Sequence, residues 1–247
     1  MSIKSILKKA ELTELDYVNI FEKKGKIYSF LNPYGYHLMR KNQTVFNNLD
    51  GLFFDGILLC LLYRIFYGKK ITRRSFDMTT VAQDLFDRIN DTGESIYFIG
   101  AKQEEIDRSV KQYKMNYSNL NIIGYRNGYF KDLDEMDQSI KQIIDFLPDF
   151  VVVGMGAIKQ EDFINRLKVN GFKGIAFTCG GYIRQSSRGI FYFPFWTNKF
   201  HLRAFYRLYK EKETWKRLYN VLIQFPYLFI IDFLSSHKMK NETKLRK

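Results

Sequence analysis

One carboxylate that could take part in proton transfer is that of Asp55, which lies between a short apolar string and a longer one. The pattern predicts a strand over residues 52–54 and a helix over 56–67. A carboxylate at a helix start often serves only to cap the helix. Apolar neighbours would partly desolvate it, however, which raises its affinity for a proton and suits it to general-base work. From these residues alone, both roles stay open for Asp55.

A second candidate site lies in residues 147–163, LPDFVVVGMGAIKQEDF. The string predicts a buried strand over 150–153, a turn that contains Gly154 and Gly156, and a new helix. Glycines at such a turn let a phosphate approach the backbone, and the helix start offers unpaired N–H groups. Three side chains of the first helical turn would then face a ligand: Lys159, Gln160 and Glu161. The same turn can also serve packing alone.

Other predicted strand ends carry residues that suit the same pocket. Asn32 follows a predicted strand over 26–31, where its side chain could hold a turn or a substrate hydroxyl. Glycines follow three further predicted strands: Gly100, Gly128 with Tyr129, and the pair Gly180-Gly181. Charged candidates elsewhere are Arg73 and Asp77, before a predicted amphipathic helix, and Arg207 and Arg217, which can share one helix face.

The succession of strands and helices predicts an α/β fold, with a mostly parallel, Rossmann-like sheet, helices on both faces and a C-terminal helical appendage. We expect residues 1–24 to be a lead-in, 25–200 to be the α/β body and 201–247 to be the appendage. Cys60 and Cys179 lie in apolar strings without metal-ligand spacing, as is typical of reduced core residues in a cytosolic protein. The first residues lack a sustained apolar run, so we expect no secretory signal.

The formal net charge of +13 indicates a polyanionic partner. Residues 197–247 hold twelve Lys or Arg against four Asp or Glu, a difference of +8. Within them the apolar stretch 221–234 is too short and interrupted to span a bilayer but suits an interfacial anchor. The alternative is a helix pair that docks on the domain or on a partner subunit. A nucleic-acid-binding protein should carry basic and aromatic residues interleaved on one sheet face. Here the positive charge gathers in the C-terminal residues beside an apolar stretch, so that class of protein is disfavoured.

The string VVVGMGAIKQEDF resembles the VGLGxPKQE signature of the WecG/TagA/CpsF glycosyltransferases, glycosyltransferase family 26, with Ile158 in place of Pro. Further motifs of that family follow in order over residues 28–219. Asp55-Gly56 matches the DG motif, and residues 201–219 resemble EWxxRLxxEPxRxxRRY. The other matching positions are Arg73 and Asp77 near GSDL, Gly100 in FLLGG, Gly128-Tyr129 in HGYF, and Gly180-Gly181 in the GG turn. The chain departs from the family at Phe30, Asn127, Tyr192, Arg203, Ala204, Lys212 and Thr214.

The resemblance implies an inverting, metal-independent glycosyltransferase that moves a sugar from a UDP-sugar to a polyprenyl-diphosphate-linked acceptor in bacterial surface polysaccharide synthesis. Asp55 would be the catalytic base. Donor or substrate contacts would come from Asn32, Arg73, Asp77, Gly100, Gly128, Tyr129, Gly154, Gly156, Lys159, Gln160, Glu161, Gly180 and Gly181. Arg207 and Arg217 would bind phosphate. Neither a metal nor a cofactor is implied, so the string Asp132-Leu133-Asp134 is interpreted as acidic residues at a helix start.

The same resemblance implies a cytoplasmic protein, peripheral on the inner face of the cell membrane, with an anionic membrane surface as a partner and no nucleic acid. The oligomeric state stays open, including a homo-oligomer. A non-catalytic α/β scaffold at the membrane surface remains the alternative, because several motif residues are replaced.

Overall fold

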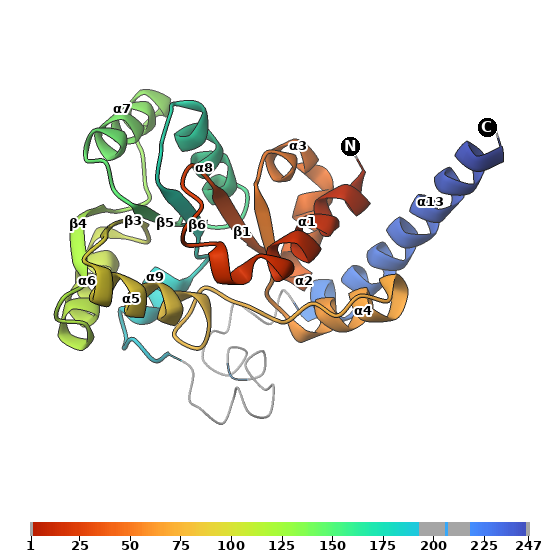
Figure 1. Cartoon of the computed structure of the whole chain (residues 1–247), viewed down its shortest axis with the longest axis horizontal. Coiled ribbons are helices and arrows are strands. Elements are labelled where there is room, and N and C mark those ends of the chain that lie inside the picture. Colours follow the sequence, from red (N-terminus) through yellow and green to blue (C-terminus); the bar gives the residue numbers. More distant parts are fainter. Residues whose placement is uncertain (1, 193–205, 207–217, 246–247) are drawn as a thin grey trace.

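Six strands form one parallel sheet in the order β2-β1-β6-β5-β3-β4 (Figure 1). This computed structural model describes residues 2–192, 206 and 218–245, with side chains to residue 236. The strands are β1 Ile27–Leu31, β2 Gly51–Phe54, β3 Ser95–Gly100, β4 Asn121–Arg126, β5 Phe150–Gly154 and β6 Ile175–Thr178. Every pairing between neighbouring strands is parallel, which confirms the predicted fold class. Strands β2, β5 and β6 are buried along their whole length, as short apolar runs in a covered parallel sheet should be.

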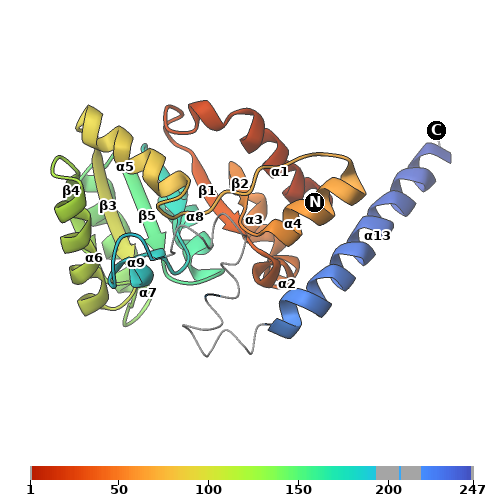
Figure 2. The same cartoon turned by 90° about the horizontal axis from the view of Figure 1, so that it is seen from below.

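Helices cover both faces of the sheet (Figures 1 and 2). The described helices are α1 Ile3–Leu15, η1 Tyr17–Asn19, α2 Pro33–Lys41, α3 Gln43–Asn47, α4 Ile57–Tyr67, α5 Val81–Thr92, α6 Gln103–Asn116, α7 Leu133–Asp145, α8 Lys159–Val169, α9 Tyr182–Ser186, η3 Asn220–Gln224 and α13 Phe225–Leu245. Residues of α5, α6 and α9 fill one hydrophobic core. Residues of α1, α2, α3, α4, α7, α8 and α13 fill the core on the other face.

Helix α1, which belongs to the predicted lead-in, packs along the outer strand β2. Its side chains Ile6 and Leu7 are fully buried. The backbone N–H of Leu52 donates to Thr13 Oγ1 at 3.0 Å, and Lys9 Nζ donates to the Leu49 carbonyl at 2.5 Å. An outer strand otherwise leaves unpaired backbone groups that can pair with another chain. The start of the chain therefore contributes core residues and protects this sheet edge.

The apolar part of the C-terminal appendage docks on the body through one side of α13. Phe225 and Phe229 are 1% exposed, and their ring centroids lie 5.1 Å and 5.7 Å from that of Tyr36. Asp232 forms an ion pair with Arg40 at 2.8 Å and accepts a hydrogen bond from the Tyr36 hydroxyl at 2.9 Å. The described part of the appendage thus shows the docked arrangement, and α13 then extends away from the body (Figures 1 and 2). None of the helices in the described residues combines the length and the apolar character needed to cross a bilayer.

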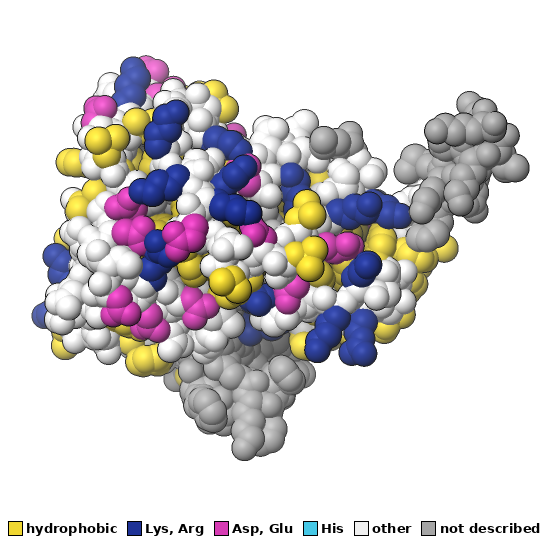
Figure 3. Space-filling model, in the orientation of Figure 1, with side chains coloured by type: hydrophobic (Ala, Val, Ile, Leu, Met, Phe, Trp, Pro, Cys, Tyr) yellow, Lys and Arg dark blue, Asp and Glu magenta, His cyan; other side chains and the backbone are white. Residues whose placement is uncertain are grey.

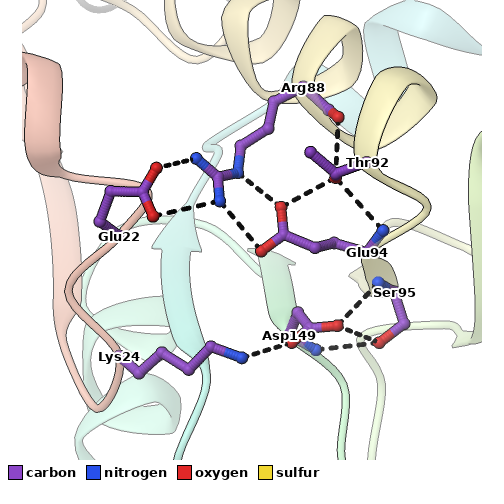
Figure 4. A network of polar contacts seen from close by, with 7 residues as sticks. All are labelled: Glu22, Lys24, Arg88, Thr92, Glu94, Ser95 and Asp149. Atoms are coloured by element: carbon purple, nitrogen blue, oxygen red, sulfur yellow. Dashed lines mark hydrogen bonds and ion pairs between the residues drawn. The ribbon is translucent and has the colours of Figure 1, made fainter.

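A polar network holds the amino ends of β3 and β5 together (Figure 4). The Ser95 amide and hydroxyl both donate to Asp149 Oδ2 at 2.9 Å, and Lys24 Nζ donates to Asp149 Oδ1 at 2.7 Å. Beside them Arg88 is held by Glu22 and Glu94. Burial alone would raise the pKa of Asp149, but the hydrogen bonds from Lys24 and Ser95 outweigh it and hold this pKa below its usual value. The network lies at the opposite end of the sheet from the predicted site residues.

Asp149→Asn is expected to make the free energy of unfolding depend less on pH in the acid range. Because the pKa of Asp149 is lower in the folded state, its stabilising contribution is present above the unfolded pKa of about 3.9 and is lost as pH falls through the folded pKa. The variant should therefore be less stable than wild type at pH 7, and the two should converge as the pH falls below about 4. Urea denaturation across this range measures the difference. Asp91→Asn, at an exposed carboxyl on α5, is the control, and parallel curves for wild type and Asp149→Asn would contradict the prediction.

Candidate active site

Asp55 and Asn32 lie side by side because they follow the ends of neighbouring strands. The register pairs Leu31 of β1 with Phe54 of β2, so the next residue of each strand reaches the same edge of the sheet. Asn32 caps α2, since its Oδ1 accepts the Gly35 N–H at 2.7 Å. The side chain of Asn32 therefore holds the turn at the start of α2, next to Asp55.

Asp55 does not cap α4, so the capping interpretation was wrong. Gly56 occupies the cap position with a φ of 150°, and α4 has no side-chain cap hydrogen bond. The Asp55 carboxylate instead accepts a hydrogen bond from Arg73 Nη2 at 3.0 Å. Its side chain is 32% exposed and that of Arg73 is 23% exposed. The pair is thus partly desolvated yet accessible to a reactant.

A chain of hydrogen bonds links Asp55 to Asp77. Arg73 Nη2 also donates to Ser75 Oγ at 3.1 Å, and Ser75 Oγ donates to Asp77 Oδ2 at 2.6 Å. Asp77 Oδ1 in turn accepts the Thr79 N–H at 3.0 Å. The structure therefore brings Asp55 together with the candidate pair Arg73 and Asp77, and the linking residue is Ser75, which was not among the candidate site residues.

A pocket adjoins this chain at Asp77. It is lined by Asp77, Met78, Thr79, Tyr182, Gln185, Ile190, Phe191 and Tyr192. On the side of Asp55, Phe30 stacks on Phe53 with ring centroids 4.8 Å apart and meets Phe76 edge-on at 6.0 Å. The partly buried ring of Phe30, at a position where Thr is common in the resembled family, thus gives the site an aromatic wall.

The glycines at the carboxyl ends of the strands have two different roles. Gly100, Gly128 and Gly154 permit close packing: an added Cβ would lie 2.4 Å from the Gly154 carbonyl oxygen at Gly100, 2.9 Å from Gly100 Cα at Gly128, and 2.8 Å from Cys179 Sγ at Gly154. Gly156 and Gly180 have open space around them and φ values of +84° and +57°. For the first three, the structure supplies a packing reason that is independent of any ligand.

A Cβ added at Gly181 would make only ordinary van der Waals contacts, so the backbone stays accessible from Gly180 to Gly181.

Tyr129 is 65% exposed, and its N–H donates to Asn127 Oδ1 at 2.9 Å. Asn127, at the place of the family's His, thus holds the turn before Tyr129. Asp132 caps α7 by accepting the Glu135 N–H at 2.8 Å, which is the helix-start role expected for it.

The three candidates at the start of α8 face different environments. Lys159 is exposed, whereas Gln160 and Glu161 are 4% and 1% exposed. Gln160 Oε1 accepts the Gly180 N–H at 3.1 Å, and its Nε2 donates to Glu161 Oε1 at 2.8 Å. Gln160 therefore links the start of α8 to the glycine pair after β6.

Glu161 lies beneath this link as a buried hydrogen-bond acceptor. Its Oε1 also accepts from Ser29 Oγ at 2.8 Å, and its Oε2 accepts the Ile158 N–H at 2.6 Å. Thr178 Oγ1 donates to Ser29 Oγ at 2.9 Å. Burial raises the pKa of Glu161, although the hydrogen bonds from Gln160, Ser29 and Ile158 oppose that rise. Ser29 and Thr178 are polar residues inside apolar strand strings, a signal that could have indicated this network.

Glu161 also holds an unusual backbone turn. Ile158 has a φ of 73°, a left-handed conformation that is strained for a β-branched residue. Its N–H is the group that Glu161 Oε2 accepts. The buried carboxylate thus fixes the turn between β5 and α8 from below instead of facing open space.

Two predicted phosphate-binding residues, Arg207 and Arg217, lie outside the described residues. Within the described residues, no group of three or more His, Cys, Asp or Glu is arranged to hold a metal ion. The arrangement that remains is a partly desolvated carboxylate beside a guanidinium, an aromatic wall, a neighbouring pocket and an open glycine turn. This set can accept a proton from a hydroxyl and can receive a bound group along the strand ends.

Comparison with known proteins gives a family and individual relatives. The model of the glycosyl transferase WecG/TagA/CpsF family matches residues 5–239. The chain is 32% identical over 219 residues to the UDP-Gal:alpha-D-GlcNAc-diphosphoundecaprenol beta-1,4-galactosyltransferase of Shigella boydii, a match that covers 88% of this chain and 90% of that one. It is 28% identical to the N-acetylglucosaminyldiphosphoundecaprenol N-acetyl-beta-D-mannosaminyltransferase of Bacillus subtilis, over 84% of this chain and 81% of that one. The protein of the same description from Bacillus spizizenii is 26% identical, over 85% and 81%.

Proposed function

Because the chain belongs to the WecG/TagA/CpsF glycosyltransferase family, we propose that it transfers a sugar from a UDP-sugar to a polyprenyl-diphosphate-linked N-acetylglucosamine in bacterial surface polysaccharide synthesis. The observation that carries this function is the accessible Asp55–Arg73 pair, at the same edge of the sheet as the open glycine turns after β5 and β6. The relatives from Shigella and Bacillus are described as acting on N-acetylglucosamine linked to diphosphoundecaprenol. The lipid-linked acceptor is therefore the common element among them.

For the donor we propose UDP-galactose, with UDP-N-acetylmannosamine as the second candidate. The relative with 32% identity and 90% coverage is described as using UDP-Gal, whereas those with 28% and 26% identity are described as transferring N-acetylmannosamine.

In the proposed reaction Asp55 accepts the proton of an acceptor hydroxyl while that oxygen attacks the anomeric carbon of the donor. A new carbon–oxygen bond forms as the bond to UDP breaks, so the anomeric configuration inverts in one displacement. Arg73 fixes the position of the carboxylate. Charge develops on the leaving diphosphate, and Lys159 at the exposed start of α8, together with Arg207 and Arg217, would offset it without a metal.

The first experiment measures acceptor-dependent UDP release with a panel of UDP-sugars and a short-chain polyprenyl-diphosphate-linked N-acetylglucosamine. We expect UDP-galactose to give the highest rate and EDTA to leave the rate unchanged. A rate that EDTA abolishes would contradict the metal-independent mechanism. Failure of UDP to bind at millimolar concentration would contradict the proposed transferase activity and favour the non-catalytic scaffold.

We further propose that the protein acts peripherally at the inner face of the cell membrane. Helix α13 and the preceding η3 expose apolar side chains on the side that does not pack on the body. Each is at least 58% exposed: Leu222, Ile223, Tyr227 and Leu234. Basic residues follow in the sequence. An apolar helix side with nearby cations is typical of binding to an anionic membrane surface.

Leu222→Ser/Tyr227→Ser is expected to reduce binding to vesicles that contain phosphatidylglycerol, because it removes apolar area from the undocked side. Co-sedimentation measures the bound fraction, which should fall several-fold. Phe225 and Phe229 stay in place, so α13 remains docked. Unchanged sedimentation would contradict a membrane role for this side of α13.

A further inference from the structure

Helix α4 presents an apolar ridge to solvent, formed by Ile57, Leu61 and Ile65. These side chains are 49%, 50% and 62% exposed. They recur every four residues, so they lie along one side of the helix. Leu59 and Tyr63, on the opposite side, are fully buried in the core. Burial of the opposite side packs α4 on the body, and the ridge stays exposed to solvent.

The position of the ridge relates it to the candidate active site. Helix α4 begins at Ile57, two residues after Asp55. With a rise of 1.5 Å per residue, Leu61 and Ile65 lie about 6 Å and 12 Å further along the helix axis. Exposed Lys69 and Lys70 follow the end of the helix. The ridge therefore runs away from Asp55 along α4.

We propose that this ridge holds the proximal part of the acceptor's polyprenyl chain, an assignment that rests on the proposed function. In such an acceptor the reacting hydroxyl, the sugar, the diphosphate and the hydrocarbon follow in that order. With the hydroxyl at Asp55, the hydrocarbon begins one sugar and one diphosphate away, in the range that Leu61 and Ile65 occupy.

The surroundings of the ridge agree with a lipid substrate. Hydrophobic side chains gather at the end of the molecule where α4 and α13 lie, with Lys and Arg around them (Figure 3). Phe66 of α4 packs on Phe229 and Phe233 of α13, so the two helices form one unit. A chain that leaves the ridge would therefore run toward the part of the molecule proposed to meet the membrane.

The test compares diphosphate-linked N-acetylglucosamine carrying either a farnesyl or a butyl group, both in solution without vesicles or detergent. We expect wild type to prefer the farnesyl acceptor by its kcat/KM, and Leu61→Ser/Ile65→Ser to reduce that preference about tenfold through the KM for farnesyl. Met115→Ser/Val169→Ser removes apolar side chains of α6 and α8 that are more exposed than Leu61 and Ile65, and it should leave the preference unchanged.

Four outcomes would overturn the assignment. A preserved farnesyl preference in Leu61→Ser/Ile65→Ser, with loss of binding to phosphatidylglycerol vesicles, would show that the ridge meets the bilayer. A dimer that this variant dissociates would show an interface between copies. Equal losses with both acceptors would indicate general damage to the site. Transfer by wild type to neither acceptor would instead reject the proposed function, and the ridge assignment with it.

Discussion

Asp55→Asn is expected to lower kcat for sugar transfer by about 10²- to 10⁴-fold while the fold and UDP binding are retained. The amide has nearly the shape of the carboxylate but does not accept a proton from the acceptor hydroxyl. The described partner of Asp55 is Arg73, and both side chains are partly exposed. Loss of this ion pair should therefore cost less than about 1 kcal/mol of unfolding free energy. The rate of UDP release under saturating acceptor and the affinity for UDP measure the two expectations separately.

Asp145→Asn is the matched control for this variant, because Asp145 is an exposed carboxyl at the end of α7. It should transfer sugar at the wild-type rate. If Asp55→Asn also does so, Asp55 is not the base, and the scaffold interpretation gains support. If Asp55→Asn loses UDP binding as well as turnover, the carboxylate acts on the donor side instead of on the acceptor hydroxyl.

Most of the sheet could be predicted because β1, β2, β3, β5 and β6 are short apolar runs that end at or shortly before Gly, Asn or Asp, whereas the edge strand β4 is partly exposed. Strands β1 and β5 begin and end within one residue of the expected ranges 26–31 and 150–153. In a parallel sheet those runs are buried on both faces, so the signal does not depend on which neighbours a strand has. The carboxyl ends of such strands meet at one edge, which is why Asn32 and Asp55 could be assigned to one site.

The roles of single residues at that edge depend on contacts that the sequence does not encode locally. Gly100 ends β3 and Gly156 comes shortly after β5, yet the first packs against the Gly154 backbone and the second borders open space. Asp55 could have capped α4, but the φ of 150° at Gly56 turns the chain in a way that leaves α4 without a side-chain cap. In each case a long-range approach or one backbone angle decides the role.

The positions of the helices near the two ends of the chain, α1 and α13, likewise could not be predicted from the local sequence. Apolar residues of α1 and α13 are consistent with a surface helix, a membrane-bound helix or a docked one. Docking of α13 is decided by Tyr36 and Arg40, almost two hundred residues earlier in the sequence, which receive Phe229 and Asp232. Such pairings between distant segments become visible only in the folded chain.

Glu161→Ala is expected to lower the unfolding free energy by about 3–5 kcal/mol, the largest effect on stability among these variants. The substitution leaves three donors without their acceptor: Ser29 Oγ, Gln160 Nε2 and the Ile158 N–H. It also opens a cavity at a side chain that is 1% exposed. Urea denaturation at neutral pH measures the loss.

The same substitution should weaken UDP binding, because Glu161 supports the turn before α8 and orients Gln160 toward the Gly180 N–H. Glu161→Gln keeps the volume and one acceptor oxygen, so it should lose less than half as much stability as Glu161→Ala.

Glu104 provides the matched control, since it occupies the first turn of α6, is exposed and should be replaceable by Ala with little change in stability. Equal losses for Glu161→Ala and Glu161→Gln would show that the negative charge itself is required. A stable Glu161→Ala that still binds UDP like wild type would show that the backbone of the turn holds its strained Ile158 without the carboxylate. Because Glu161 is buried beneath the turn, the loss of UDP affinity should follow the loss of stability across the two variants, whereas a residue that touched UDP directly would lose affinity alone.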